Sequence, residues 1–557
     1  MNRLGRLIAA ITLAPGIAGA QAVIGPWDDA TIVPPGMIRL GLGVHFGAWN
    51  ERLDAAGQRV SLGEPLSFQA LGPGLLPGIG TLPTDLGVLT GIADPGLSLG
   101  SLRTRVNVTE VRTPITVEYG LATRIGLHIV IPYVKNRVHV SAAPNTPPTT
   151  PTIGLNPAWS FPGARSRNAT VVSELVSAAT TLDGELARCA GSTDPTCALV
   201  NADRAAAMAL VSRATTTATA LASVYGTTAV PGSAYAPLAG SGLSQSVDAT
   251  LTALGTDLAT FLGAAPAGSW VPSRPVPAAP LAGADLDALL GDPVYGIDAR
   301  VLSDYEHSHV GDIEVGARLL LIDTFGPRAT TSTLPRAGAI RLAVGGTLRL
   351  ATAQLDLPND FTDVGTGDRQ ADLEVRGHGD FAFGPRLWTS AVLRIGIQRP
   401  DRLVRRVPAG ATDPFPEVVN ELEVARDLGD YIEAEVAPRY VPNDAFALSA
   451  LYRYRSRGAD AYRGTFDVTR VDGTPVRLDA AVLGAGTEQT EHLLGLAVTL
   501  STVRGYALRE ARWPLEVSLV HTRVLSGRGI PRIATTGIGV RLYRPVLGNP
   551  LRPTANR

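Results

Sequence analysis

The segment QADLEVRGHGDFAFG, at 370–384, alternates between ionisable and uncharged residues. Asp372, Glu374, Arg376, His378 and Asp380 occupy every second position, and the residues between them carry no charge. Because alternate side chains of a β-strand point to opposite faces, this segment has one charged face and one apolar face. The pattern predicts a strand that separates two different environments.

The same alternation recurs along the chain and predicts about twelve strands. They lie within 37–49, 111–134 (two strands), 311–321, 339–350, 371–383, 387–398, 431–440, 446–455, 492–501, 513–522 and 535–543. Strands of soluble proteins average about 5–6 residues, whereas a strand tilted across a bilayer needs about 9–11. No Asp, Glu, Lys or Arg occurs on the apolar faces of these segments. Since an arginine or lysine that faces lipid near the midplane costs about 2–4 kcal/mol, this exclusion favours membrane-spanning strands.

The connections between these segments differ systematically in length. The long ones are 50–104, 141–309, 399–428 and 457–490, and the tight ones include LATRI, GPR and VPND. If the N-terminus lies in the periplasm, every long connection falls on the outer side, which is typical of outer-membrane barrels. We therefore predict an all-β fold, a transmembrane antiparallel up-and-down β-barrel of about 12 strands, within a range of about 12–14. The barrel closes because an open edge in hydrocarbon would leave backbone groups unpaired.

The N-terminus, MNRLGRLIAAITLAPGIAGAQA, has two arginines before a short apolar run that ends in small residues. It predicts a secretory signal peptide over 1–22. We expect the mature chain, 23–557, in the bacterial outer membrane of a Gram-negative type envelope, where outer-membrane lipid surrounds it. The net charge of −1 gives no indication of a nucleic acid partner.

The connection 141–309 has helical spacing between Pro-rich flanks and predicts a largely helical extracellular insertion. It contains the only cysteines of the chain, Cys189 and Cys197. In an oxidising compartment they predict a disulfide that joins the first two helices into a hairpin. The insertion could be a lid or plug over a pore, or a surface feature without a role in transport. The connection 50–104 is apolar enough to fold inward or to touch lipid headgroups.

Ionisable residues on the inward faces of the predicted strands carry both signs in similar numbers. Two roles are open for them: arginine–carboxylate ladders that hold the shape of the barrel, and a polar pathway whose charge selects solutes. A barrel of about twelve strands is too wide for side chains alone to fill easily. The candidate lumen-lining residues are Arg341, Arg349, Asp372, Glu374, Arg376, His378, Asp380, Arg394, Glu433, Glu435, Arg439, Arg453 and Arg455.

Signals for catalysis or for a bound cofactor are weak. No phosphate-binding loop, zinc signature or nucleophile elbow occurs in the sequence. The segment DYEHSH, at 304–309, brings two histidines near acidic residues, but without a third ligand at a defined spacing. His378 lies between carboxylates, without a serine nucleophile and a partnered base. We predict no catalytic residue, no metal site, no cofactor and no enzymatic activity.

Two segments resemble a known family of bacterial outer-membrane proteins. VEYGLATRIGLHIVIPYV, at 117–134, is followed much later by VGDIEVGARLLL, at 310–321. The motifs are similar to those of the "meta-pathway of phenol degradation" family, and the matching residues are Glu118, Tyr119, Gly120, Pro132, Tyr133, Gly311, Asp312 and Ile313. The resemblance implies a barrel related to channels for hydrophobic compounds.

The last predicted strand, 535–543, resembles the assembly signal of outer-membrane barrels, which implies the barrel-assembly machinery as a partner. Together these features predict a porin-like channel for the passive uptake of small-molecule solutes, with hydrophobic or aromatic compounds as candidates. The alternative is a structural or adhesive surface protein, in which the barrel only anchors the insertion 141–309.

Overall fold

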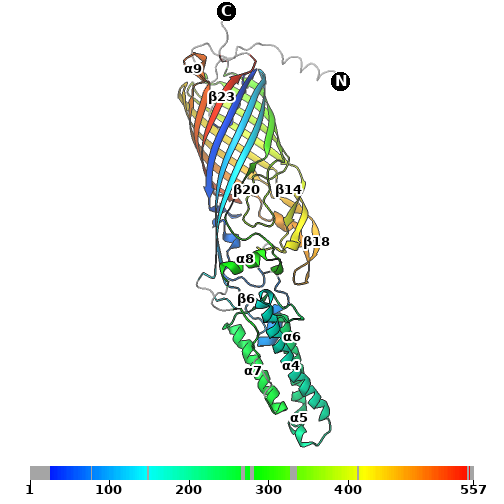
Figure 1. The fold of residues 1–557 in the computed structure, drawn as a ribbon. Helices are drawn as coiled ribbons and strands as arrows, with labels where there is room; N and C mark the ends of the chain where they lie inside the picture. Colours follow the sequence, from blue (N-terminus) through cyan, green and yellow to red (C-terminus); the bar gives the residue numbers. More distant parts are fainter. Residues whose placement is uncertain are drawn as a thin grey trace, which may run out of the picture.

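The computed structural model describes residues 26–76, 78–146, 150–264, 270–275, 281–325, 335–410, 413–547 and 551. The predicted signal peptide, 1–22, lies outside the described residues. The described chain forms a barrel and a long extension that continues from one end of the barrel (Figure 1).

Twelve antiparallel strands form the barrel, and each pairs with the barrel strands that precede and follow it in the sequence. The first and last strands close the ring, with Met37 opposite Pro545 and Ala48 opposite Ala534. The prediction of a closed up-and-down barrel is therefore confirmed. The strands are β1 (Met37–Trp49), β4 (Leu102–Ala122), β5 (Ile125–Pro144), β9 (Ile313–Asp323), β10 (Ile340–Leu350), β11 (Asp372–Ala382), β12 (Leu387–Gln398), β15 (Tyr431–Asn443), β16 (Phe446–Arg457), β20 (Gln489–Ser501), β21 (Leu515–Arg528) and β23 (Ala534–Pro545).

The outer face of the barrel is apolar and exposed, whereas the inner face is polar and largely buried. On β21, the side chain of Leu519 is 53% exposed, while its neighbour Ser518 is buried. On β11, Val375 is exposed and its neighbour Glu374 is buried. The apolar face of the segment 370–384 therefore meets lipid, and its charged face points into the barrel, as the alternation predicts.

The two ends of the barrel differ, as the connection lengths predict. At one end, here called the short-turn end, tight turns join β4 to β5, β11 to β12 and β15 to β16. The helix α9 (Val503–Ala507) lies at the same end, together with the start of β1 and the end of β23 (Figure 1). The long connections gather at the opposite, long-loop end. In outer-membrane barrels these two ends are periplasmic and extracellular, respectively.

Two barrel strands continue past the rim at the long-loop end. β4 is 21 residues long and β5 is 20, and their pairing reaches from the turn to Leu102 opposite Pro144. The strand β8 (Tyr305–Val310) pairs with the outer half of β5. The connections expected at 50–104 and 141–309 thus begin and end as strands, and these strands support the base of the extension.

The extension is a helical arm. Its helices α4 (Pro162–Arg188), α6 (Arg204–Tyr225) and α7 (Gly242–Leu262) coincide with the segments of helical spacing, so the predicted helical insertion is confirmed. The Asp203 side chain accepts a hydrogen bond from the backbone of Ala206 and caps α6. Further helices are α3 (Pro157–Ser160), α5 (Ala198–Ala202) and α8 (Gly283–Gly291). Among the described residues, none of the helices has the length and apolar composition needed to cross a membrane.

The connection 50–104 enters the barrel with Leu53, which packs on Ala437 and Leu451 of the inner wall, and it also contributes a helix to the arm. Its helix α2 (Leu82–Thr90) packs against α6. Leu82, Leu86 and Leu89 are buried there in the largest apolar cluster of the molecule. The expectation that the connection folds inward therefore describes Leu53, whereas the apolar side chains of the helix are buried against another insertion.

Short strands organise the remaining connections. β13 (Asp401–Arg406), β14 (Glu421–Asp427) and β17 (Ala461–Arg463) form one small sheet, and β18 (Thr465–Thr469) pairs with β19 (Pro475–Asp479). β2 (Glu51–Leu53), β3 (Arg59–Ser61) and β22 (Ile530–Pro531) form another sheet, and β6 (Ile153–Leu155) pairs with β7 (Tyr235–Pro237). The sequence analysis treated these segments as plain connections, because each is too short for a periodic pattern.

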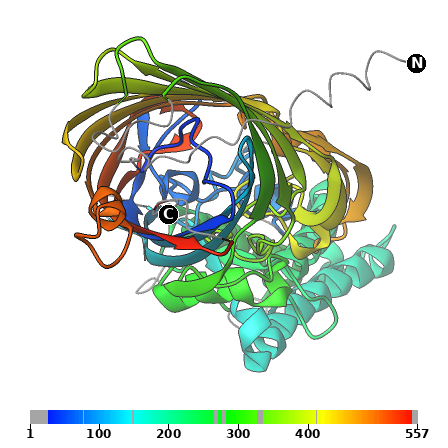
Figure 2. The ribbon, with the colours of Figure 1, turned by 90° about the horizontal axis from the view of Figure 1, so that it is seen from above.

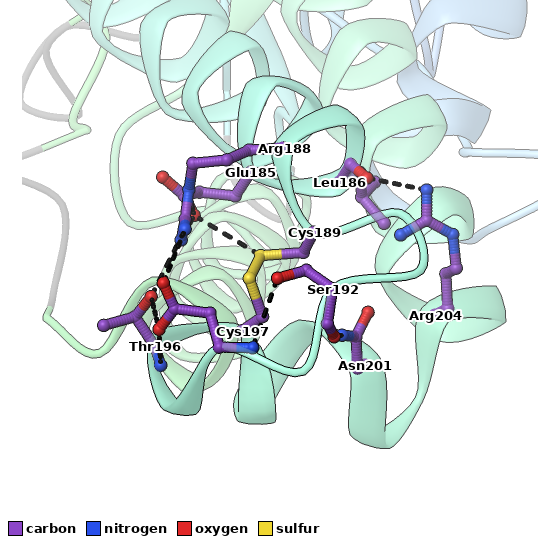
Figure 3. Close-up of a disulfide and its surroundings, with 10 residues drawn as sticks. Glu185, Leu186, Arg188, Cys189, Ser192, Thr196, Cys197, Asn201 and Arg204 are labelled. Atoms are coloured by element: carbon purple, nitrogen blue, oxygen red, sulfur yellow. Dashed lines mark hydrogen bonds and ion pairs between the residues drawn. A yellow bond between two sulfur atoms is a disulfide. The ribbon is translucent and has the colours of Figure 1, made fainter.

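The predicted disulfide is present at the tip of the arm (Figure 3). It joins Cys189, which ends α4, to Cys197, which precedes α5, and both residues are buried. Arg188 pairs with Glu185 beside it. The bond closes the bend between α4 and α6, so these two helices form a clipped hairpin.

Replacing both cysteines is expected to loosen the tip of the arm and leave the barrel intact. The cysteines are 8 residues apart in the sequence. Closing so short a loop removes chain entropy worth about 2.5 kcal/mol from the unfolded arm. Limited proteolysis between α4 and α6 should therefore be up to about 70-fold faster in Cys189→Ser/Cys197→Ser. The matched double variant Ala190→Ser/Ala198→Ser keeps the disulfide, and equal cleavage of the two variants would contradict the prediction.

A charge on the outer face should destabilise the barrel. Leu519→Arg is expected to lower the free energy of unfolding in lipid vesicles by about 2–4 kcal/mol, because the guanidinium would face hydrocarbon. Thr522→Arg is the control, since it puts the same charge on the inner face of the same strand. Denaturant titrations that show equal losses for the two variants would contradict the assignment of the faces.

Candidate functional site in the barrel interior

The barrel interior contains a segment of the chain's own N-terminal region. Residues 26–34 precede β1 and lie inside the ring of strands (Figure 2). The segment enters at the short-turn end, where the amide of Gly36 donates to the carbonyl of Gly120 at 2.9 Å. A Cβ atom on Gly120 would lie 2.1 Å from the carbonyl oxygen of Pro34, so only glycine allows the strand to approach the entering segment this closely. We call residues 26–34 the lumen segment.

Asp28 attaches the lumen segment to three strands. Its Oδ1 atom lies 2.7 Å from Arg318 of β9, and its Oδ2 atom lies 3.0 Å from Arg394 of β12. The Oδ2 atom also lies 3.1 Å from Nε2 of His378 on β11. A single carboxylate therefore connects side chains from three different strands, and it neutralises part of their positive charge.

Asp29 and Thr31 of the lumen segment contact the same side of the barrel. Arg318 donates to the carbonyl of Asp29 at 2.6 Å and to that of Thr31 at 3.1 Å. Arg341 donates to the Thr31 hydroxyl at 3.1 Å. Arg439 of β15 lies 3.6 Å from the Asp29 carboxylate. These contacts fix the backbone of the segment as well as its side chains.

An apolar contact adds to this attachment. Ala30 and Ile32 of the lumen segment form a buried cluster with Leu320 of β9 and Ala343 of β10. The backbone amide of Ala30 also donates to Asp380 at 3.4 Å. The lumen segment is thus held on this side by charge, by hydrogen bonds and by apolar packing. On the other side, Trp27 packs near Gly495 of β20 and Pro34 lies against Gly120 of β4.

The predicted lumen-lining residues lie on the inner face, and most of them form ladders of arginine and carboxylate. Arg349 joins Glu314 at 3.2 Å to Asp372 at 3.0 Å. Arg376 lies 3.0 Å from Glu314 and also pairs with Glu374. Arg349 thus connects β10 to both of its neighbours, and Arg376 connects β11 to β9 across β10, an arrangement that holds the shape of a barrel.

The ladder continues around the charged side. Arg394 pairs with Glu433 and lies 2.9 Å from Glu435. Arg453 lies 2.8 Å from Glu491, and Arg341 lies 3.4 Å from Asp380. The guanidinium of Arg455 lies over the ring of Tyr431, 4.4 Å from its centroid. The strands from β9 to β16 thus form a charged half of the wall.

The opposite half of the wall carries small side chains among charged ones such as Arg39, Glu118 and Glu516. Gly41 and Gly43 of β1, Ser518 of β21 and Gly539 of β23 occupy its inner positions. A Cβ atom on Gly539 would have no other heavy atom within 4 Å. Small residues leave space, and part of this space borders the lumen segment.

Two cavities occupy this space. One, of about 180 Å³, borders the lumen segment, β4, β5 and Arg541 of β23. The other, of about 190 Å³, borders β1, β4, β21 and β23. Pro26, Thr116 and Arg541 line both of them, so the cavities adjoin.

The sequence analysis identified the ladder residues but missed the lumen segment. Its sequence, PWDDATIVP at 26–34, shows no alternation. The one signal that could have indicated it is the pair Asp28–Asp29, which stands in an otherwise uncharged stretch shortly after the predicted signal peptide. Arg39, which pairs with Glu118 at 3.0 Å, was also missed as a lumen residue.

The segment DYEHSH does not form a metal site in the described structure. His307 lies on β8, 3.6 Å from Asp363, and its ring stacks on Tyr305. Within the described ranges, no group of three or more His, Cys, Asp or Glu side chains is arranged to hold a metal ion. His378 pairs with Asp28 and so belongs to the attachment of the lumen segment.

Comparisons with known proteins add structural neighbours. No family model and no curated protein matches the chain, so the resemblance to the phenol-degradation family stays a prediction. An outer-membrane channel from Pseudomonas putida is 8% identical and aligns over 94% of this chain and 100% of its own, with a TM-score of 0.40. The toluene transporter TodX of P. putida is 9% identical over 92% and 90%, with a TM-score of 0.23. A FadL homologue of Pseudomonas aeruginosa is 7% identical over 92% and 90%, with a TM-score of 0.25. These scores are too low to transfer a substrate or a mechanism.

Neutralising Asp28 is expected to release the lumen segment. In Asp28→Asn, the arginines at 318 and 394 lose a charged partner, and breaking a buried ion pair costs about 3–5 kcal/mol. Amide hydrogen exchange in 28–32 should become about 100-fold faster or more. Asp54→Asn is the control, because Asp54 caps an exposed turn at the long-loop end. Unchanged amide exchange in Asp28→Asn would contradict this prediction and show that the other contacts hold the lumen segment in place.

Proposed function

We propose that the protein is an outer-membrane channel for the passive uptake of small molecules, with hydrophobic and aromatic compounds among its solutes. The main support is the pair of adjoining cavities beside the lumen segment. A barrel that served only as an anchor would need no space inside its ring. Apolar cavities of about 150 Å³ bind benzene, so each cavity is large enough for a molecule of that size.

In this proposal, a solute diffuses down its gradient from the extracellular to the periplasmic end of the barrel. The ladders keep the ring open, because their arginines join different strands of the wall. Most of the predicted lumen-lining residues therefore hold the shape of the barrel. Those that border the cavities determine which solutes pass. Outer-membrane lipid surrounds the barrel, and the barrel-assembly machinery would insert it.

Support for hydrophobic solutes comes from a third cavity, at the base of the arm. It measures about 430 Å³, and its lining is mostly apolar, including Leu82, Trp159, Val230 and Val471. It belongs to the long-loop end, which faces the medium in this proposal. An apolar or aromatic molecule would gain free energy by leaving water for such a surface, so the cavity would concentrate it near the mouth of the barrel.

The adhesive alternative rests on the length of the arm, which extends far beyond the barrel (Figure 1). The part of the arm that contains α4 and α6 can be removed at a natural boundary. β6 and β7 pair at its base, and the amide of Asn156 donates to the carbonyl of Ala234 at 2.9 Å. Replacing 157–233 by two glycines therefore joins two positions that already lie side by side.

Conductance of the purified protein in planar bilayers tests the proposal. We expect steady conductance from the full-length chain and from the variant that lacks 157–233, because the cavities lie within the barrel. Heat-resistant migration on gels verifies that both barrels are folded. If neither protein conducts, the channel function is wrong and the anchor is favoured.

A further inference from the structure

We propose that the strands β4 and β5 bind the phosphate groups of outer-leaflet glycolipid where they continue past the rim at the long-loop end. The outward face of the two strands is basic there, and we call it the basic strip. This proposal concerns the lipid around the barrel and does not depend on the channel function. The strip consists of Arg103, Arg105, Asn107 and Thr109 of β4 and of Lys135, Arg137, His139 and Ser141 of β5.

The two faces of β5 exchange their character at Tyr133. Before it, the outward residues are apolar, and the side chain of Ile129 is 40% exposed. After it, Lys135 and Arg137 occupy the outward positions, while the inward Val138 is buried in the apolar cluster of the arm. An exposed tyrosine at such a boundary is typical of the membrane interface. Hydrocarbon therefore ends near Tyr133, and the basic strip begins directly beyond it.

The strand β4 shows the same change further from the membrane. Ile115 is an exposed, apolar outward residue, whereas Arg103 and Arg105 are exposed outward residues past the rim. In the register of the two strands, Thr109 lies opposite Arg137 and Arg105 lies opposite Ser141. The arginines of β4 thus continue outward the row of basic residues that begins on β5.

Positive charge exceeds negative charge at the lower end of the strip. Glu306 of the neighbouring strand β8 lies 2.5 Å from Lys135 and 2.5 Å from Arg137, so one carboxylate serves two cations. His139 lies 2.6 Å from Asp304. Since Glu306 can neutralise only one of its two partners, one positive charge remains at the level where the lipid headgroups begin.

At the upper end, the arginines face outward without a carboxylate. Within the described ranges, neither Arg103 nor Arg105 forms an ion pair. The segment beside β4 approaches Arg105 at Gly63, and its one carboxylate there, that of Glu64, lies 3.7 Å from Arg52. The upper part of the strip is therefore complementary to an anion from outside the chain.

The length of the strip indicates which lipid covers it. From Lys135 to the level of Arg105, the strip measures about 20 Å along the strand, or about 15 Å along the membrane normal at a tilt of about 40°. The headgroup layer of a bilayer adds only about 5–7 Å beyond the hydrocarbon. A phospholipid would thus reach Lys135 and Arg137 alone. A glycolipid with phosphates on its lipid part and on its inner sugars would reach the whole strip.

Native mass spectrometry of the purified full-length protein tests the upper end with two probes. Lipid A carries phosphates at the membrane level only, whereas a short-core lipopolysaccharide also carries them on its inner sugars. Arg103→Gln/Arg105→Gln should weaken binding of the lipopolysaccharide about 25-fold, because each basic side chain near an anionic lipid surface contributes a factor of about five. The same variant should bind lipid A as the wild type does.

Arg167→Gln/Arg477→Gln is the matched control for this variant. Both arginines are exposed, lie on α4 and β19, and form no ion pair in the part of the chain that the structure describes. The control removes the same charge from the protein and should leave both affinities unchanged. Equal losses in the two double variants would overturn the strip, because they would reflect net charge alone.

Glu306→Gln tests the lower end in the opposite direction. Removing the shared carboxylate leaves Lys135 and Arg137 available to a phosphate, so both probes should bind about fivefold more tightly. Glu423→Gln is the control, because Glu423 pairs with Arg402 outside the strip. Unchanged or weaker binding in Glu306→Gln would overturn the phosphate site and leave Glu306 with a purely structural role between β5 and β8.

The source of the phosphate is tested with the wild type. Binding that persists after the phosphates of the lipopolysaccharide are removed would overturn the proposal, and so would equally tight binding of phosphatidylglycerol. Competition by inorganic phosphate at the concentration of the lipid would show a site for a free anion instead. Heat-resistant migration on gels verifies that each variant is folded, and the Glu306 series does not depend on the arginine variants.

Discussion

Hydrocarbon offers no hydrogen bonds to a polypeptide backbone, and this constraint underlies the whole structure. Every strand that crosses the membrane must pair on both sides, so the sheet closes where β1 meets β23. The same solvent excludes charge from outward positions and therefore imposes alternation on every strand. Polar side chains are concentrated on the inner face as a consequence. The charged interior is thus a product of the surrounding lipid.

A charged interior creates a second problem, because arginines held in a confined space need partners. Ladders within the wall satisfy many of them, as Arg349 shows with Glu314 and Asp372. The lumen segment supplies further carboxylates, and Asp28 alone meets two arginines and a histidine. Leaving a buried charge without its partner costs several kcal/mol, so this pairing fixes the segment to the charged half. The unequal distribution of small and charged side chains then decides where open space remains.

The arm is stabilised in a different way from the barrel, because it lies in water. Its helices bury an apolar cluster of their own, which includes Leu175, Leu182 and Leu210. The disulfide clips its tip, and the paired strands β6 and β7 close its base. The long strands β4 and β5 connect it to the barrel. The apolar cluster of the arm extends onto these strands through Val106 and Val138, so the barrel and the arm share contacts there.

Local periodicity determined much of this protein from the sequence alone: the barrel strands, the helices of the arm and the asymmetry of the connections each follow from patterns within a few residues. The disulfide followed from two isolated cysteines. Pairing between distant positions was decided by the tertiary structure, since Asp28 and Arg394 are 366 residues apart. No periodic pattern marks the lumen segment, and nothing local indicates that α2 packs on α6. Contacts of this kind depend on register and on which faces remain uncovered, and those exist only once the ring has closed.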